Sequence, residues 1–175
     1  MKWIPMILLA AMLGGCATKQ MATTAQWNEA AAQEARAEVE KSVRLITAMD
    51  LEGLKAEITQ DGFVTIYDLD FEGKPVRMGT RDEGIQYLKT IFDEAKKMGA
   101  TLDMGVPSIH CRATSTIAYC VMEYDFSATM PDGQKMTQPS RTSLVLRKGE
   151  DGWKWMHWHT SLATVPAPPA APSEP

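Results

Sequence analysis

The spacing of apolar residues changes along the chain, from a helical period to a strand period. Between Trp27 and Met49 the apolar residues form one stripe in a segment rich in Ala, Glu, Gln and Arg, which predicts a long amphipathic helix. Asp50 is placed to cap a second, short helix with the sequence LEGLKAEI. Residues 81–98 repeat the helical pattern between the N-cap residue Thr80 and the helix-ending Gly99. We therefore expect about three helices.

Strand patterns follow the second and third helices. FVTIYDLD has the β-branched and aromatic content of a strand, and beyond Gly99 the period becomes two, with strands near 101–111, 116–129, 134–147 and 153–162. The positions expected to face the core are Ala118, Cys120, Met122, Tyr124, Phe126, Thr142, Leu144, Leu146, Met156, Trp158 and Leu162. These strands predict an antiparallel meander with one face on the core.

The first residues predict export. Lys2 precedes an apolar run from Ile4 to Leu13, and Gly14, Gly15 and Cys16 follow, which is the order of a secretory signal. The run is well short of the roughly 20 residues that span a bilayer as a helix. The sequence LGGC resembles the lipobox of bacterial lipoproteins, and that resemblance implies cleavage before Cys16 and acylation of it. An ordinary signal peptide with an incidental cysteine is the alternative.

The chain divides into four segments. Residues 1–15 are the predicted signal peptide, and residues 16–25 hold the lipidated Cys16 and a flexible tether of small polar residues. One folded domain spans 26–163, and the Pro-dense segment 164–175 is a predicted disordered tail. Because Ala17, not Asp, follows Cys16, lipoprotein sorting rules imply the outer membrane. We expect the domain to face the periplasm from its inner leaflet, attached to the membrane by the lipid only.

Composition limits the function classes. A net charge of -4 and a hydrophobic content of 45% fit one ordinary core and offer no basic patch for nucleic acid. In an exported domain, Cys111 and Cys120 meet an oxidising compartment. If Ser115 and Thr116 form a two-residue turn, the two cysteines lie directly opposite each other, so we expect them to form a disulfide.

The closing segment, RTSLVLRKGEDGWKWMHWHTS, carries a family resemblance. It resembles the last hairpin of SnoaL-like domains of the nuclear transport factor two-like superfamily, and the association domain of calcium/calmodulin-dependent kinase ends similarly. The matching positions are Thr142, 144–147, 151–153 with Trp153, His157, His159 and Ser161. The resemblance implies an α+β fold: a cone-shaped, curved antiparallel sheet wrapped on about three helices, also called cystatin-like. This fold hosts isomerases, cyclases, dehydratases, oligomerisation hubs and binding modules, so the fold alone does not decide the function.

Catalytic residues of the related isomerases and cyclases are not matched. Those enzymes need a carboxylate base in the pocket, and the core-facing strand positions identified above carry no Asp or Glu. Asp125 falls on the opposite face by parity, although a bulge would reverse it. We therefore assign no catalytic residue and no cofactor. We expect an apolar pocket lined by Tyr67, Tyr87, Tyr124, Met156 and Trp158.

Metal binding is the weaker interpretation of the histidines and methionines. His157 and His159 share a strand face and would need a third ligand such as His110, but their motif recurs in family members without metal. Four methionines fall in the strands without the short spacing of a metal-binding tract: Met104, Met122, Met136 and Met156. Core filling explains them, and we expect no metal.

The face of the sheet turned away from the core is less polar than water exposure requires. Its predicted members are Tyr119, Val121, Val145, Trp155 and His157. Family members commonly dimerise through this convex face, so we expect a homodimer.

The leading hypothesis is a lipid-anchored, non-enzymatic module that binds a small apolar ligand or acts as a dimeric interaction module. An isomerase, cyclase or dehydratase acting on a small apolar substrate is the alternative, and it needs a carboxylate or histidine inside the cone. A third possibility is an interaction protein with a vestigial, filled pocket.

Overall fold

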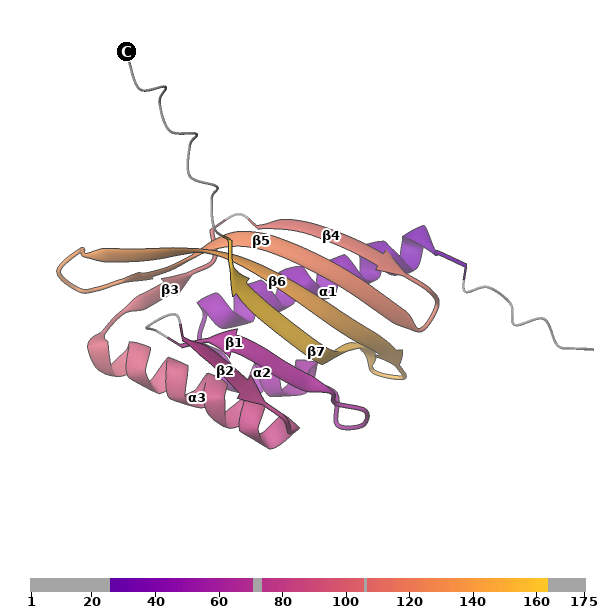
Figure 1. Ribbon diagram of the computed structural model, residues 1–175, viewed down its shortest axis with the longest axis horizontal. Coiled ribbons are helices and arrows are strands. Elements are labelled where there is room, and N and C mark those ends of the chain that lie inside the picture. Colours follow the sequence, from indigo (N-terminus) through magenta and orange to yellow (C-terminus); the bar gives the residue numbers. More distant parts are fainter. Residues whose placement is uncertain (1–25, 71–73, 106, 164–175) are drawn as a thin grey trace, which may run out of the picture.

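The computed structural model describes residues 26–70, 74–105 and 107–163 (Figure 1). The predicted signal peptide, Cys16 with its tether, and the Pro-rich tail lie outside the described residues. In the described ranges the elements are α1 (Glu29–Thr47), α2 (Leu51–Glu57), β1 (Thr65–Leu69), β2 (Pro75–Met78), α3 (Arg81–Met98), β3 (Thr101–Asp103), β4 (Ser108–Ala113), β5 (Ile117–Thr129), β6 (Lys135–Gly149) and β7 (Gly152–Leu162). None of the helices in these ranges has the length and hydropathy needed to cross a membrane.

Local capping sets where the helices begin and end. Asn28 Oδ1 accepts a hydrogen bond from the backbone N–H of Ala31 at the start of α1. Asp50 Oδ1 accepts one from the backbone N–H of Gly53 at the start of α2. Thr80 and Glu83 form a capping box at the start of α3. Gly99 ends α3 with a φ of 66°, a left-handed conformation that favours glycine. The predicted ends at Asp50, Thr80 and Gly99 are thus confirmed.

The strands form one curved sheet in the order β2-β1-β7-β6-β5-β3, and β4 also pairs with β5 (Figure 1). The pairing of β1 with β7 is parallel, so the sheet is mixed where the sequence predicted an antiparallel one. Helix α1 packs against β4 and β5, while α3 packs against β1, β2 and β3. The helices therefore cover the concave face of the sheet and leave the convex face outside.

The strands differ from the prediction in two places. The strand expected at 101–111 is divided into β3 and β4, and Gly105 between them has a φ of 58°. A backbone in that region interrupts a strand and favours glycine. Strand β2, which begins at Pro75 on the sheet edge, was not predicted. Proline lacks a backbone N–H and is tolerated there.

The predicted alternation along β5 is confirmed. Ala118, Cys120 and Met122 are fully buried against the helices, whereas Tyr119 and Asp125 are exposed on the outer face. The same inner face continues on β6 through residues 142, 144 and 146, which are also fully buried. Parity therefore identifies the core side of the long strands wherever the pairing is regular.

A β-bulge interrupts that regularity on β7. Val145 pairs with His157 but the next residue, Leu146, pairs with Trp155, so Met156 is the extra residue. The bulge reverses the parity of the preceding residues and turns Trp155 inward, where only 3% of it is exposed. The prediction that Trp155 belongs to the outer, dimerising face is wrong for this reason.

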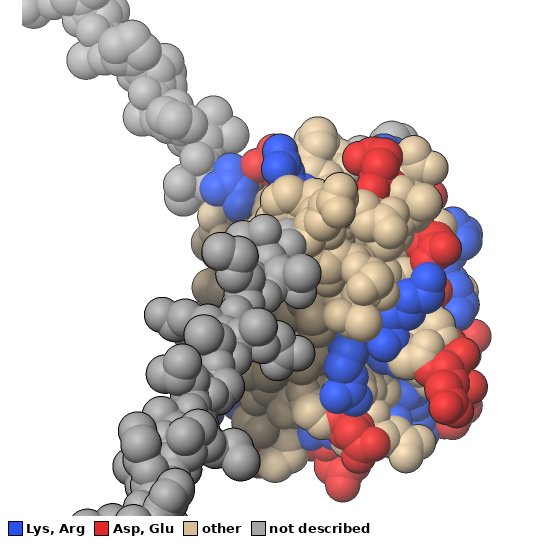
Figure 2. Space-filling view, turned by 90° about the vertical axis from the view of Figure 1, so that its right-hand side faces the viewer, with Lys and Arg blue, Asp and Glu red and all other residues tan. Residues whose placement is uncertain are grey.

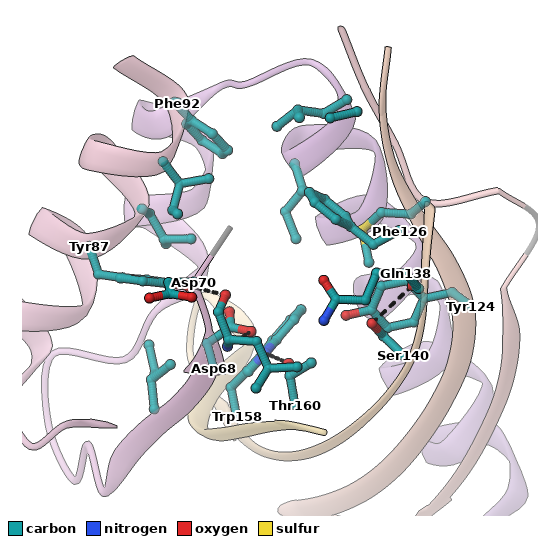
Figure 3. A pocket seen from close by; sticks show the side chains of 18 of the residues that line it. Asp68, Asp70, Tyr87, Phe92, Tyr124, Phe126, Gln138, Ser140, Trp158 and Thr160 are labelled. Atoms are coloured by element: carbon teal, nitrogen blue, oxygen red, sulfur yellow. Dashed lines mark hydrogen bonds between the residues drawn. The ribbon is translucent and has the colours of Figure 1, made fainter. Parts of the chain in front are cut away.

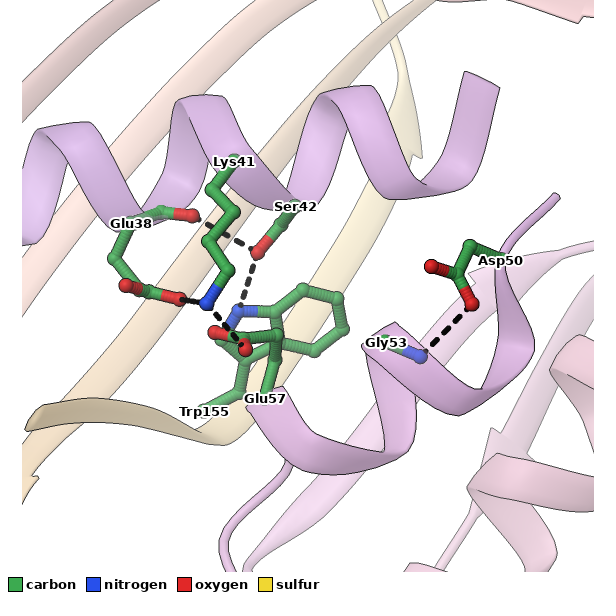
Figure 4. A network of polar contacts seen from close by, with 7 residues as sticks. All are labelled: Glu38, Lys41, Ser42, Asp50, Gly53, Glu57 and Trp155. Carbon is green, nitrogen blue, oxygen red and sulfur yellow. Dashed lines mark hydrogen bonds and ion pairs between the residues drawn. The ribbon is translucent and has the colours of Figure 1, made fainter. Parts of the chain in front are cut away.

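Polar contacts fix α1 to the elements beneath it (Figure 4). Trp155 Nε1 donates to Ser42 Oγ at 3.1 Å, and the Ser42 hydroxyl donates to the backbone carbonyl of Glu38 at 3.0 Å. The Lys41 ammonium donates to the buried Glu57 carboxylate at 2.7 Å. A buried carboxylate is costly unless a cation compensates it, so Lys41 stabilises the junction between α1 and α2.

Charged side chains of both signs lie side by side on the end of the molecule shown in Figure 2. Residues of α1 form exposed ion pairs. Arg36 Nε lies 2.9 Å from Glu40 Oε1, and the Glu34 carboxylate pairs with the Lys148 ammonium of β6. Hydrogen bonds from Lys148 and Trp153 lower the pKa of Glu34. Such exposed pairs add little stability individually.

Cys111 and Cys120 are joined by a disulfide between the directly paired positions of β4 and β5. The register is the one expected from a turn at Ser115 and Thr116, since Ala113 pairs with Ala118. Cys120 is fully buried, so the bond lies on the core side of the sheet.

Replacing both cysteines with alanine is expected to lower the free energy of unfolding by about 2 to 3 kcal/mol. The bridge closes a short loop, with a sequence separation of 9, and its loss returns chain entropy to the unfolded state. Urea denaturation of the oxidised wild type, the reduced wild type and the double variant measures this. The last two should agree, and an oxidised wild type no more stable than either would contradict the prediction.

Candidate functional site

A cavity of about 360 Å³ lies between the concave face of the sheet and the helices α1 and α3. Most of its wall is apolar, formed by Ile46, Ile66, Leu88, Ile91, Phe92, Leu102, Met104, Phe126, Ala128, Trp155 and Trp158. Polar groups come chiefly from the strands (Figure 3): Asp68, Asp70, Tyr124, Gln138, Ser140 and Thr160. The cone is therefore open inside, whereas a vestigial pocket would be filled by side chains.

Asp68 is one of the two lining carboxylates, with Asp70, that the sequence pattern did not reveal. It lies on β1 two residues after Ile66, and both side chains line the cavity. Because Tyr67 pairs with His159 in parallel register, the next residues along the two strands, Asp68 and Thr160, lie side by side. The expectation that the pocket contains no carboxylate is therefore wrong.

Burial changes the acidity of Asp68. Loss of water raises the pKa of its carboxyl from 3.8 to about 6, although hydrogen bonds from the Leu69 backbone and the Thr160 hydroxyl oppose the shift. The Leu69 bond is 2.9 Å long. At neutral pH the group is mostly ionised, yet it is a stronger base than a carboxylate in water.

A chain of hydroxyls leads from Tyr124 to Asp68. Tyr124 Oη lies 3.1 Å from Thr142 Oγ1, which lies 3.0 Å from Thr160 Oγ1. Thr160 Oγ1 also accepts the indole N–H of Trp158 at 2.6 Å. An indole only donates and an ionised carboxylate only accepts, so the hydrogens must be directed from Tyr124 through the threonines to Asp68. The network thus converges on the carboxylate.

Tyr87 faces the cavity from α3, opposite Tyr124 (Figure 3). Its hydroxyl donates to the backbone carbonyl of Leu69 at 2.7 Å. Burial, and then the nearby charge of Asp68, raise the pKa of Tyr87. The same causes raise the pKa of Tyr124 to about 12. Both phenols are consequently neutral at physiological pH.

The predicted pocket residues divide into two groups. Tyr87, Tyr124 and Trp158 line the cavity. Tyr67 instead lies on the outer face, where it is 36% exposed and its ring packs against His159 at 5.6 Å. Met156 is the bulged residue of β7 and lies beside Gly62, outside the cavity lining. The assignments of Tyr67 and Met156 to the pocket are corrected accordingly.

The family-motif residues lie on the closing hairpin of β6 and β7. Trp153 is buried, and its indole N–H lies 3.3 Å from a carboxylate oxygen of Glu34. His157 Nδ1 lies 3.1 Å from the carbonyl of Thr65, and His159 is exposed beside Tyr67. Ser161 pairs with Arg141 in the β6–β7 ladder. The motif therefore builds the sheet and places no histidine inside the cone.

The candidate metal ligands do not converge. Two strands, β6 and β5, separate His157 and His159 on β7 from His110 on β4, which contacts Ser108. Met104 and Met122 are buried in the core, whereas Met136 is 51% exposed. Among the residues whose placement the structure gives, no three His, Cys, Asp or Glu side chains gather in a metal-binding group.

The curved sheet, its three helices and the cavity between them define the nuclear transport factor two-like cone. The model of the SnoaL-like domain family matches residues 36–166, so the chain belongs to that family. None of the curated proteins matches it in sequence.

Solved structures with the same fold differ in their assigned roles. A candidate dehydratase of the NTF2-like family from Streptomyces avermitilis is 15% identical, with 79% of this chain and 100% of that chain covered and a TM-score of 0.68. A candidate aromatic ring hydroxylase from Novosphingobium aromaticivorans is 12% identical, with coverages of 80% and 94% and a TM-score of 0.60. A candidate calcium/calmodulin-dependent kinase association domain from Xanthomonas campestris is 14% identical, with coverages of 78% and 89% and a TM-score of 0.57. At these identities the likeness shows the fold alone.

Proposed function

We propose that this cone binds a small, mostly apolar molecule whose polar group lies against Asp68. The observation that carries the proposal is an open apolar cavity with an ionisable carboxyl and a converging hydroxyl network on one side. Pockets of this kind obtain affinity from the apolar wall and orientation from a few polar groups. Asp68 is the orienting group.

Proton transfer at Asp68 is the second candidate function, of the isomerase, cyclase or dehydratase kind. It is favoured by a carboxylate with a pKa near 6 inside an apolar cavity, since a base acts best when its pKa lies near the working pH. Tyr124 lines the same cavity with a neutral phenol. Conversion of a bound molecule by the wild type, abolished in Asp68→Asn, would identify this function.

The site is proposed to act at a bacterial cell envelope. The sequence Leu13-Gly14-Gly15-Cys16 supports a lipid anchor, and the disulfide between Cys111 and Cys120 is consistent with an oxidising compartment. We also propose that two copies pair through the convex face. Because Trp155 faces inward, it is not part of the convex face. The exposed tyrosines that the structure places on that face are Tyr119 and Tyr67.

Native mass spectrometry of the domain from residue 17 onward, made in an exported form, tests ligand and assembly together. The wild type should carry a reproducible small mass and should bind prodan, a neutral apolar dye. In the matched variant Ile91→Trp, the larger indole enters the cavity from α3 and narrows it, so both should be strongly reduced while the circular dichroism spectrum is kept. A wild type that carries no mass and binds no prodan would contradict the binding function. A single-copy mass would contradict the dimer.

A further inference from the structure

We propose that the molecule bound in the cone is an apolar amine, held as an ammonium ion by the Asp68 carboxylate. This inference rests on the proposed binding function and adds the chemical class of the ligand. It follows from the charges, the hydrogen-bond donors and the aromatic rings that line the cavity.

The charged residues in the described lining are all acidic. Asp68 and Asp70 come from β1 and its end, and the lining contains no Lys, Arg or His. Asp70 accepts a hydrogen bond from the backbone of Lys74 at 2.8 Å, and Asp68 accepts one from the backbone of Leu69 at 2.9 Å and one from the Thr160 hydroxyl. A carboxylate can accept about four hydrogen bonds, so Asp68, which is directed toward the cavity, can still accept one from a ligand (Figure 3). An anionic ligand would place a second negative charge beside Asp68 in a poorly hydrated space, which is strongly unfavourable.

Most lining donors are already engaged with protein acceptors. The Tyr87 hydroxyl donates to Leu69, the Trp158 indole donates to Thr160, and the Ser140 hydroxyl donates to the carbonyl of Gln138 at 3.2 Å. The hydroxyl chain from Tyr124 is directed toward Asp68. The Gln138 amide can donate or accept, so it favours neither kind of ligand. A ligand with its own donor therefore meets an acceptor at Asp68.

Charge distinguishes an amine from an alcohol. Either could donate to Asp68, but only an ammonium ion compensates the carboxylate that burial has deprived of water. The rings of Tyr87, Phe92, Phe126 and Trp158 line the same cavity and can attract a cation through their faces. The site thus matches an ammonium group joined to an apolar body.

The pH dependence follows from the groups that face Asp68. Asp70 lies on the same strand end, Tyr87 faces it from α3 and Tyr124 from β5, and the raised pKa of each tyrosine keeps it neutral below about pH 9. Binding of an amine should therefore weaken as the pH falls through about 6, where Asp68 becomes protonated. Binding of a neutral ligand should not follow this titration.

Three probes of matched shape test the proposal: phenylbutylamine, phenylbutanol and phenylbutanoate, titrated by calorimetry at pH 7.5 and 5.0. The amine should bind the wild type at least about tenfold more tightly than the alcohol at pH 7.5, and the carboxylate least. Asp68→Asn should remove the advantage of the amine and weaken the alcohol much less, because an amide oxygen still accepts a hydrogen bond but carries no charge. Asp125→Asn, which removes an exposed carboxylate from the outer face of β5, is the control and should change neither.

The outcomes separate this inference from the proposed function. If the alcohol binds as tightly as the amine, or if Asp68→Asn leaves the amine unaffected, while Ile91→Trp still weakens binding, the cone binds small molecules but does not select amines. Preferential binding of the carboxylate would also overturn the inference. If the wild type binds neither these probes nor prodan, the binding function itself fails.

Discussion

Trp155→Ala is expected to lower the free energy of unfolding by about 3 to 5 kcal/mol, the range for removing a buried aromatic side chain. Trp155 is 3% exposed, and its ring lies 4.8 Å from that of Trp158. Its indole N–H donates to Ser42 of α1, and its backbone carbonyl accepts from Thr59 after α2. One residue of β7 therefore connects both helices to the sheet. Urea denaturation monitored by circular dichroism measures the loss.

Two further variants separate the contributions. Trp155→Phe keeps an aromatic ring but leaves the Ser42 hydroxyl without its donor, so a smaller loss of about 1 to 2 kcal/mol is expected. Trp27→Ala removes a tryptophan that is 60% exposed and should change stability by less than about 0.5 kcal/mol. Equal effects of Trp155→Ala and Trp27→Ala would contradict the inward position of Trp155.

The correct and incorrect parts of the fold prediction have different physical origins. Helix caps at Asp50 and Thr80 depend on residues three positions away, so the sequence contains the whole signal. The alternation along β5 likewise follows from strand geometry once its pairing is regular. The bulge at Met156 is different, because an extra residue in a ladder depends on how β6 and β7 pair in three dimensions. One such residue was enough to misplace Trp155.

The candidate site was predicted only in its apolar part. Tyr124 and Trp158 follow from strand parity and line the cavity. Tyr87, which was expected there as a phenol and not from the helical pattern, lines it too. Asp68 was missed because β1 is short and joins the sheet in parallel beside β7, far along the chain. Alternation within TIYDL pairs Ile66 with Asp68 on one face, which was the available signal, but a carboxylate in a strand is usually read as a solvent-facing residue.

Asp68→Asn is expected to raise the free energy of unfolding at pH 7.5 by about 1 to 3 kcal/mol, while it removes selective amine binding. Burial raises the pKa of this carboxyl to about 6 in the folded protein, against 3.8 for its ordinary value. Between these values the folded state binds more protons than the unfolded state, so the wild type loses stability as the pH rises from about 4 to about 6. The whole pKa shift of Asp68 corresponds to the upper value of about 3 kcal/mol. Water in the cavity screens the carboxylate and so lowers the expected gain toward about 1 kcal/mol.

The pH profile is the decisive measurement, because a neutral amide has no charge to desolvate. Asp68→Asn and the wild type should be about equally stable near pH 4, diverge as the pH rises to 6, and differ by a constant amount above about pH 7. Asp125→Asn, which removes an exposed carboxylate from the outer face, is the control for the loss of one charge. A wild type that becomes more stable than Asp68→Asn as the pH rises would show that the Asp68 carboxylate is stabilised in the fold, and the cavity would then need no cation. A gain in stability together with a loss of amine binding would mean that the protein retains an unfavourable buried charge for the sake of its ligand.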